Sequence, residues 1–256
     1  MCMEICSHEI AFEWIRSGRD DQPFGRGDSR WVGNFVSHLL PKTFAAYTKV
    51  FHQIDASYEN IDNPLSPKEL EILRIPPCVE MRSFIENLRA NGQGPRLRWK
   101  ELAEFLKVPF QPELNHEWYR AKLEPGCWPR FLKGPDEGTL NHEECSALVS
   151  ALLPSTGHQR CFFRFAEIPF IATDKPIMFQ GSLDEVRTFL DDEVYRFTPE
   201  YWWPADRNWC VCSDYDLMFT VVGGSRDLIS RLSENKVLEC IEVKPSTRID
   251  SYAVAK

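Results

Sequence analysis

The sequence predicts an α+β fold in which helices pack against a central sheet of about five strands. Three observations support this prediction. Helix signals dominate residues 66–153, strand-like apolar segments concentrate in the C-terminal half, and two of these segments lead through glycine and serine into a helix. A mixed α/β arrangement stays open, because the last strand, helix and strand could form a β-α-β unit.

The first 30 residues are predicted to be an extension of this fold. Residues 1–16 fit one short amphipathic helix, and residues 17–30 form a polar connector that contains glycines. The connector includes the tripeptide Arg26-Gly27-Asp28, which arises easily by chance and receives no role here. A single α+β domain is predicted for residues 31–256.

The first half of that domain is predicted to be mainly helical. Residues 31–41 read as a short helix ended by Pro41, and residues 45–54 alternate as a strand does, with a helix as the open alternative for this second segment. Ser66, Pro67 and Glu69 form the start of a helix with a capping box. Further helices are predicted over residues 78–90, 98–106, 114–122 and 140–153. The prolines and glycines of residues 124–138 predict a loop without regular structure.

The second half supplies most of the predicted strands, over residues 160–166, 175–180, 209–222 and 238–245. Fourteen residues, 209–222, are long for one strand, so a turn at residues 213–216 is expected to divide them into a hairpin. Ser182 and Ser225 are predicted N-caps of the helices that follow two of the strands, and Glu185 supports Ser182.

Composition limits the classes of partner. The formal net charge is −8, and residues 129–256 carry 14 Lys and Arg against 20 Asp and Glu. This balance argues against nucleic acid or a membrane as a partner and favours a basic protein at the C-terminal half. No apolar run is long enough to span a membrane and the N-terminus does not resemble a secretory signal, so a cytoplasmic location is predicted.

The nine cysteines are predicted to be free thiols without a metal site. Their number is odd and their spacing is irregular. Cys210 and Cys212 lie two residues apart on one side of a predicted strand, at a separation of roughly 6.5–7 Å that disfavours a disulfide. The sequence identifies no cofactor.

Asp214 and Asp216 are weak candidates for catalysis. Two crowded carboxylates raise one another's pKa and can serve in acid–base chemistry or bind Mg²⁺. Aspartates at a turn also make local hydrogen bonds, and this structural role is the favoured interpretation.

The candidate binding residues form two groups. Gly224, Ser225 and Arg226 open a helix whose free N–H groups could hold an anion, although the lysine of a P-loop is missing. The second group is the aromatic segment 201–209. If exposed, it could stack on a sugar, a base or a partner; the favoured alternative is burial as a clasp on the sheet. Its candidate residues are Trp202, Trp203, Asp206 and Arg207, the last two expected to pair with each other.

The segment YWWPADRNWCVCSDYDLMFTVVGGSRDLI, residues 201–229, resembles a set of uncharacterised bacterial proteins that are common in actinobacteria. These share a Trp-Pro-x-Asp-Arg-x-Trp-Cys segment, a following acidic pair and a Val-Gly-Gly-Ser joint. The likeness extends to residues 39–52, 98–105 and 178–186. It implies one folding unit from about residue 31 onward in a bacterial cytoplasmic protein, and it brings no activity and no catalytic residues.

Three functional hypotheses follow. The leading one is a non-enzymatic interaction protein, similar in role to SUKH-type immunity proteins, that binds a basic protein partner through the acidic C-terminal half. The alternative is an enzyme acting on a small polar or phosphorylated substrate, with Asp214 and Asp216 as reactive or metal-binding groups and the Gly224–Ser225 helix terminus as an anion site. The third is a sugar- or nucleotide-binding module that uses Trp202 and Trp203.

Overall fold

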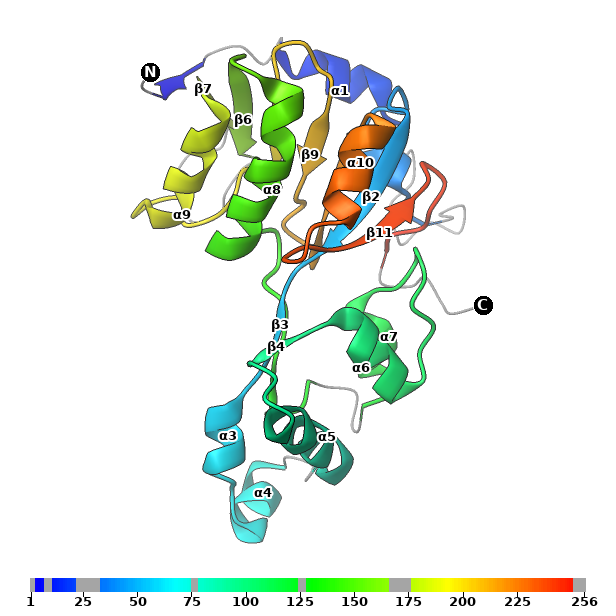
Figure 1. The fold of residues 1–256 in the computed structure, drawn as a ribbon, viewed down its shortest axis with the longest axis vertical. Coiled ribbons are helices and arrows are strands. Elements are labelled where there is room, and N and C mark those ends of the chain that lie inside the picture. The colour runs from blue at the N-terminus through cyan, green and yellow to red at the C-terminus, as the bar shows by residue number, and fades with distance from the viewer. Residues whose placement is uncertain are drawn as a thin grey trace. The chain divides into compact units, whose positions relative to one another are not determined.

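The computed structural model describes residues 3–6, 11–21, 33–74, 78–123, 128–165 and 176–250. The chain divides into two compact units (Figure 1). Unit 1 contains the residues up to His52 together with Asp136–Asp250, and the described part of unit 2 is Gln53–Pro135. Unit 2 is therefore an insertion into the sequence of unit 1. The division passes through the stretch 31–256 that the sequence predicts as one domain.

Unit 1 is built on one eight-stranded sheet. The described strand pairs are all antiparallel. The predicted mixture of helices and strands is confirmed, but the predicted number of about five strands is wrong. The strands, in their order across the sheet, are β1 (Glu4–Ile5), β7 (Ile177–Gly181), β6 (Cys161–Phe165), β8 (Tyr201–Pro204), β9 (Cys210–Cys212), β10 (Phe219–Gly224), β2 (Ala46–Phe51) and β11 (Glu239–Val243).

The N-terminal residues depart from the prediction. Glu4 and Ile5 do not belong to a helix over residues 1–16, because they form β1 and pair with Gln180 and Phe179 of β7. The helix of this region, α1, covers only Glu13–Gly18. A two-residue edge strand forms because it hydrogen-bonds to a strand that is distant in the sequence. The periodicity of the local sequence does not reveal such a partner.

Helices cover one face of the sheet (Figure 1). Their apolar side chains join those of the strands in one core that includes Leu148, Phe163, Trp202 and Leu228. Asn141 caps the longest of these helices, since its side chain accepts a hydrogen bond from the Glu144 N–H group (2.9 Å). The helices are α8 (His142–Thr156), the 3-10 helix η2 (Leu183–Arg187), α9 (Thr188–Asp191) and α10 (Arg226–Ser233).

Aromatic side chains from α1 and the residue before it cover part of the other face. The ring of Phe12 packs edge-on against Tyr201 at 5.0 Å, and Trp14 packs against Trp203 at 6.3 Å. The short helix α2 (Val36–Leu39) lies between α1 and β2 in the sequence. Burial on both faces explains why every residue of β8, β9 and β10 is buried.

The predicted β-α-β unit is present in a split form. Strands β10 and β11 each pair antiparallel with β2, so they run parallel to each other with β2 between them. Helix α10 connects them, and its predicted cap is confirmed: the Leu228 N–H group donates to Ser225 Oγ at 3.2 Å. The hairpin predicted for residues 209–222 is also confirmed, with β9 and β10 joined by a turn over residues 213–218.

Unit 2 contains a three-stranded sheet and short helices. Its strands, in sheet order, are β4 (Arg96–Leu97), β3 (Ile54–Ala56) and β5 (Leu132–Lys133), and β5 corrects the prediction of a wholly irregular loop over residues 124–138. The capping box of Ser66 and Glu69 is confirmed. The helices are α3 (Tyr58–Asp62), α4 (Pro67–Leu73), α5 (Val79–Ala90), α6 (Trp99–Leu106) and α7 (His116–Arg120).

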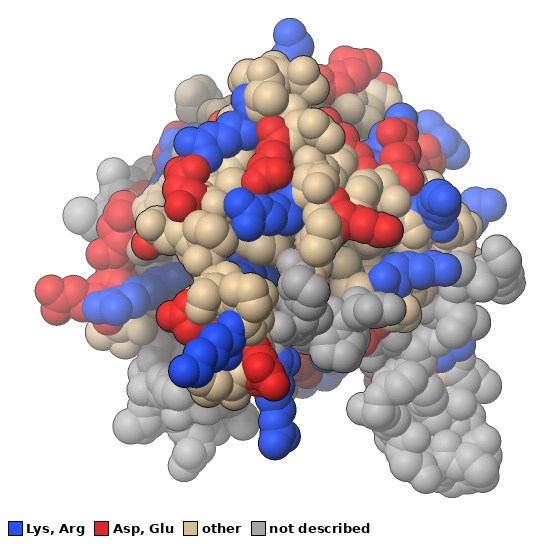
Figure 2. All heavy atoms as spheres, turned by 90° about the horizontal axis from the view of Figure 1, so that it is seen from below, with Lys and Arg blue, Asp and Glu red and all other residues tan. Residues whose placement is uncertain are grey.

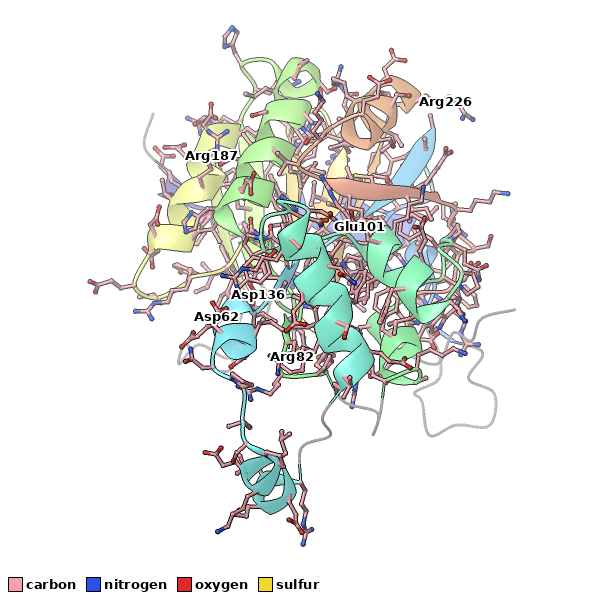
Figure 3. All side chains as sticks on the ribbon, turned by 60° about the horizontal axis from the view of Figure 1, so that its bottom comes forward. Asp62, Arg82, Glu101, Asp136, Arg187 and Arg226 are labelled. Carbon is pink, nitrogen blue, oxygen red and sulfur yellow. The ribbon has the colours of Figure 1, made fainter. Side chains whose placement is uncertain are left out.

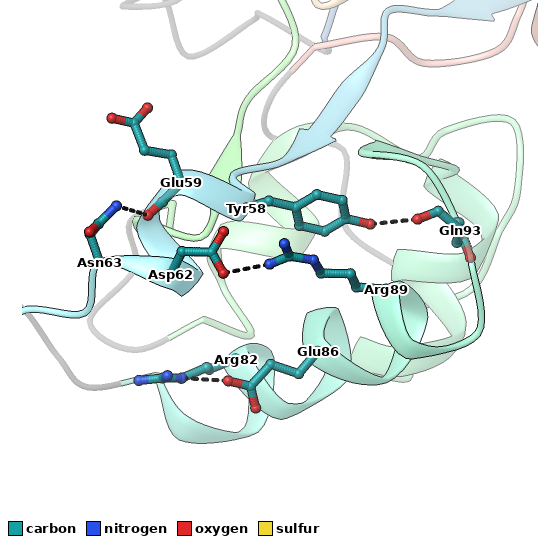
Figure 4. A network of polar contacts seen from close by, with 8 residues as sticks. All are labelled: Tyr58, Glu59, Asp62, Asn63, Arg82, Glu86, Arg89 and Gln93. Carbon is teal, nitrogen blue, oxygen red and sulfur yellow. Dashed lines mark hydrogen bonds and ion pairs between the residues drawn. The ribbon is translucent and has the colours of Figure 1, made fainter.

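Polar contacts join α3 to α5 within unit 2 (Figure 4). Arg89 forms an ion pair with Asp62 at 2.6 Å, and its guanidinium lies 4.9 Å from the centre of the Tyr58 ring. The Tyr58 hydroxyl donates to the carbonyl oxygen of Gln93 (2.8 Å). These groups are largely exposed, so they orient the two helices and add little stability. In the described part of the chain, no helix has both the length and the apolar character needed to cross a membrane.

The points where the chain leaves and re-enters unit 1 are in contact: a ring nitrogen of His52 lies 2.7 Å from the carbonyl oxygen of Asp136. A short Gly-Ser linker can therefore bridge residues 52 and 136. We expect a protein with residues 53–135 replaced by such a linker to keep unit 1 folded, with near-UV circular dichroism from its buried tryptophans. Loss of that signal and of cooperative unfolding would instead support the single domain predicted for residues 31–256.

Candidate functional site

Six of the thirteen residues that line a cavity of about 400 Å³ in unit 1 are acidic. The segment after α1, helix α2, the residue before β8, the turn after β9 and the end of the described chain all contribute to its wall. Arg19 and His38 are the basic side chains in the lining. The acidic side chains are Asp20, Asp21, Glu200, Asp214, Asp216 and Asp250.

The sheet brings two of these carboxylates together. Strands β8 and β9 pair so that Tyr201 lies opposite Cys212, and the Ser213 N–H group donates to the carbonyl oxygen of Glu200 at 2.8 Å. Glu200 and Asp214 therefore extend from the same end of neighbouring strands. The Asp214 carboxylate is close enough to raise the pKa of Glu200.

The turn that carries Asp214 and Asp216 is held by hydrogen bonds. Asp214 Oδ1 accepts from the Asp216 N–H group (3.0 Å), and the Gly138 N–H group donates to the carbonyl oxygen of Leu217 (2.9 Å). Gly138 has a φ of +66°, and a Cβ at this position would collide with the Tyr215 backbone. The prediction of a turn with local aspartate hydrogen bonds is confirmed.

Asp20 and Asp250, which also line the cavity, have cationic partners. Lys42 Nζ lies 2.6 Å from Asp20 Oδ1 and lowers the pKa of Asp20. Arg248 Nε lies 2.7 Å from Asp250 Oδ2, and the Asn34 N–H group donates to the same oxygen. The charges of Asp20 and Asp250 are therefore already compensated in large part.

Glu200 and Asp214 are less well compensated. Arg164 Nη1 forms an ion pair with Glu200 Oε2 at 2.7 Å, yet burial outweighs this contact and raises the pKa of Glu200 to about 7. Burial also raises the pKa of Asp214. Within the described part of the chain, neither lysine nor arginine forms an ion pair with Asp214.

Arg19 forms part of the wall near these two carboxylates. Its Nη1 donates to the Tyr201 hydroxyl (2.9 Å), which in turn donates to the carbonyl oxygen of Leu39 (3.0 Å). The charge of Arg19 lowers the pKa of both Glu200 and Asp214. The Tyr201 hydroxyl therefore holds the Arg19 guanidinium in place, and the guanidinium acts on Glu200 and Asp214 through its charge.

The structure separates the candidate residues of the sequence into four places. Asp214 and Asp216 line the cavity. Trp202 and Trp203 are buried, as the favoured interpretation of the aromatic segment predicts, and this leaves no ring face free to stack on a sugar or base. The β8–β9 turn holds Asp206, which accepts from Asn208 N–H (3.1 Å), and Arg207, whose guanidinium lies 5.4 Å from the Trp14 ring centre. Asp206 thus pairs with its neighbours and not with Arg207.

The glycine-serine joint lies far from the acidic turn along β10. The turn precedes Phe219 and the joint follows Gly224, and a six-residue strand spans roughly 17 Å. Ser225 Oγ already caps α10, and exposed Arg226 projects from the first turn of that helix (Figure 3). Asp214, Asp216 and this helix terminus therefore do not lie together in one compact site.

A buried imidazole lies near the acidic turn but is closed to a substrate. His52 Nε2 is 3.0 Å from Thr220 Oγ1, which is 2.6 Å from Ser213 Oγ. The three side chains are fully buried, and burial lowers the pKa of His52 to about 4. The carbonyl oxygen of Asp136 accepts a hydrogen bond from His52 Nδ1. The neutral imidazole and the two hydroxyl groups therefore connect neighbouring strands, and because they are buried they provide no accessible nucleophile.

The cysteines of the described residues are free thiols, as predicted. Cys210 and Cys212 are free, buried thiols whose pKa burial raises well above its usual value. Within that same part of the chain, no three His, Cys, Asp or Glu side chains are arranged to hold a metal ion.

Sequence reasoning missed Glu200, Asp20 and Asp250 as parts of the site. The signals are weak, because Glu200 is one carboxylate before an aromatic strand and Asp20 is separated from it by 180 residues. Only the strand pairing and the contacts of α1 bring them together. Elsewhere charge is mixed: on the face drawn in Figure 2, the coloured acidic and basic side chains are intermingled.

No family model, curated protein or solved structure matches this sequence. We therefore infer the chemistry of this cavity from its own side chains.

Gly138→Ala tests the support of the acidic turn. A left-handed φ and the collision with Tyr215 should together lower the free energy of unfolding by roughly 1–3 kcal/mol, measured by urea denaturation. Gly92→Ala is the matched control, since Gly92 also has a positive φ but a Cβ added there would meet no atom within 4 Å. Equal losses in the two variants would show that the contact with Tyr215 does not support the turn.

Glu200 should make the protein less stable as pH rises from about 5 to 8. Its pKa of about 7 lies above the ordinary value of 4.5, so between these values the folded protein binds more protons than the unfolded chain. The free energy of unfolding must then fall with rising pH over this window. His52 has the opposite slope below pH 6.5, because its pKa is lowered.

The comparison of the wild type with Glu200→Gln isolates this contribution. The difference between the two free energies of unfolding, from urea titrations at several pH values, should change most between about pH 5 and 7 and level off above it. A difference that is constant with pH would show that Glu200 ionises normally in the folded protein.

Proposed function

We propose that the protein is a non-enzymatic interaction protein whose acidic cavity receives a basic side chain of a protein partner. The observation that supports this proposal is the pair of partly buried carboxylates, Glu200 and Asp214, in a cavity where acidic groups outnumber basic ones. A buried negative charge attracts a cation more strongly than an exposed one, because water screens it less.

Tyr215 supports a protein as the source of that cation. Its side chain is 65% exposed and lies between Asp214 and Asp216 on the turn that borders the cavity. Exposed tyrosines are frequent anchors of protein interfaces, and an aromatic face also attracts a guanidinium or ammonium group. The turn thus offers an aromatic and an acidic contact to one basic side chain.

A more specific form of this proposal is that the partner is a toxin, which the protein neutralises as an immunity protein does. Four of the six acidic side chains in the cavity, Glu200, Asp214, Asp216 and Asp250, come from the acidic C-terminal half. A toxin that acts on nucleic acid needs a basic surface to bind its substrate. A cavity that holds a basic side chain of that surface would compete with the nucleic acid, which is a direct way to neutralise such a toxin.

One observation favours an enzyme as the second candidate. A carboxyl group with a pKa of about 7 in a cavity is suited to transfer protons at neutral pH, and Glu200 has this property beside Asp214. Such an enzyme would act on a small cationic substrate. The anion site at Ser225 would take no part, because it lies at the other end of β10.

Affinity purification of the tagged protein from a bacterial host, compared with two variants, tests the interaction. Asp214→Asn with Asp216→Asn removes two charges from the cavity, and Asp227→Asn with Glu234→Gln removes two exposed charges on and after α10. A stoichiometric protein partner should be retained by the control and bound about tenfold or more weakly by the cavity variant. Equal affinity of both variants for that partner would contradict the proposal.

A further inference from the structure

The acidic turn, residues 213–218, is hydrogen-bonded to the chain at both ends of the inserted unit 2. On the exit side, the His52 N–H group donates to the carbonyl oxygen of Met218 (3.2 Å). On the return side, the Gly138 N–H group donates to the carbonyl oxygen of Leu217 (2.9 Å). The turn that forms part of the cavity wall is therefore anchored to the two chain segments that lead to and from unit 2.

Side chains connect the same segments. His52 Nδ1 donates to the carbonyl oxygen of Asp136 (2.7 Å), and His52 Nε2 lies 3.0 Å from Thr220 Oγ1. Thr220 Oγ1 is in turn 2.6 Å from Ser213 Oγ, at the start of the turn. One buried imidazole thus holds the exit segment against both the return segment and the hairpin that carries the turn. We refer to these side-chain and backbone hydrogen bonds together as the clamp.

Unit 2 holds its own two ends together. Strands β3 and β5 lie near the two ends of the inserted segment, and they pair so that Asp55 is opposite Lys133. With unit 2 folded, about six residues and one strand pair connect His52 to Asp136, whereas an unfolded unit 2 is a flexible loop of about 80 residues. The probability of closing a flexible loop falls with about the 3/2 power of its length, so folding of unit 2 favours the closed clamp by up to about fiftyfold.

We infer that unit 2 regulates the cavity: its folding closes the clamp and fixes the acidic turn, and a ligand or partner that opens unit 2 releases the turn. The coupling acts in both directions, so a closed clamp stabilises unit 2 by the same factor. This regulation goes beyond the proposed function and stands whatever the cavity binds, because it depends on hydrogen bonds at the ends of the insertion.

Hydrogen–deuterium exchange of the full-length protein, followed by mass spectrometry of its peptides, tests the direction from unit 2 to the turn. Ile85→Ala removes a fully buried side chain from α5 and should open unit 2 more often, whereas Ile72→Ala makes the same change at a side chain of α4 that is 68% exposed. We compare the variants at a urea concentration where unit 2 of Ile85→Ala exchanges about tenfold faster than in the wild type. There the peptide 213–218 should also exchange several times faster, by up to about fiftyfold, and Ile72→Ala should match the wild type in both places.

Thr220→Val tests the reverse direction. The substitution keeps the shape of the side chain but removes the hydroxyl between His52 and Ser213, so it weakens the clamp without a change in unit 2. We expect exchange in β3 and β5 to become about fivefold faster or more. Thr156→Val is the matched control and should leave unit 2 unchanged, because the buried Thr156 hydroxyl bonds to Leu152 and Trp209 in the core of unit 1.

Three results would overturn the inference. In the first, unit 2 of Ile85→Ala opens while the peptide 213–218 keeps its wild-type exchange. In the second, α8 of unit 1 exchanges faster by the same factor as the turn, which would show that the whole protein opens at once and that the clamp has no separate role. In the third, Thr220→Val and Thr156→Val have the same effect on unit 2. If Thr220→Val does not fold, the comparison of Ile85→Ala with Ile72→Ala decides alone. Neither experiment contains a ligand, so these failures leave the basic-partner proposal intact.

Discussion

The antiparallel pairing of β8 with β9 is the constraint on which the cavity depends. With Tyr201 opposite Cys212, the residues just outside the ladder, Glu200 and Ser213, are joined by a hydrogen bond, and Asp214 follows directly. The same register places Trp202 beside Val211 in the buried core. A slip of one residue would turn these side chains to the opposite faces of the sheet, so burial of the core determines the register. The register in turn places Glu200 and Asp214 next to each other.

This arrangement places ionisable groups where they reduce stability. Burial raises the pKa of Glu200 and Asp214, which means that the folded protein disfavours their ionised forms. A core composed of aromatic and aliphatic side chains on both faces of the sheet can compensate for that cost. Glu200 and Asp214 are thus a local source of instability at the cavity.

The sequence allows local features to be predicted better than distant ones. The caps at Ser66 and Ser225 and the turn at residues 213–216 follow from residues adjacent in the chain, and the structure contains them. The predicted number of strands is too low in part because β1 exists only through its pairing with β7. Glu200 and Asp20 meet only after the sheet and the α1 contacts have formed, so no spacing rule could reveal the cavity around Asp214.

The insertion point of unit 2 shares a hydrogen-bond chain with the acidic turn. His52, the last residue of unit 1 before the insertion, contacts the hydroxyl of Thr220, and Thr220 contacts Ser213, which precedes Asp214. These hydrogen-bonded side chains are buried and neutral. They therefore hold the end of β2 to the β9–β10 hairpin whether or not the neighbouring carboxylates are ionised. The turn can therefore keep its position while Glu200 gains or loses a proton.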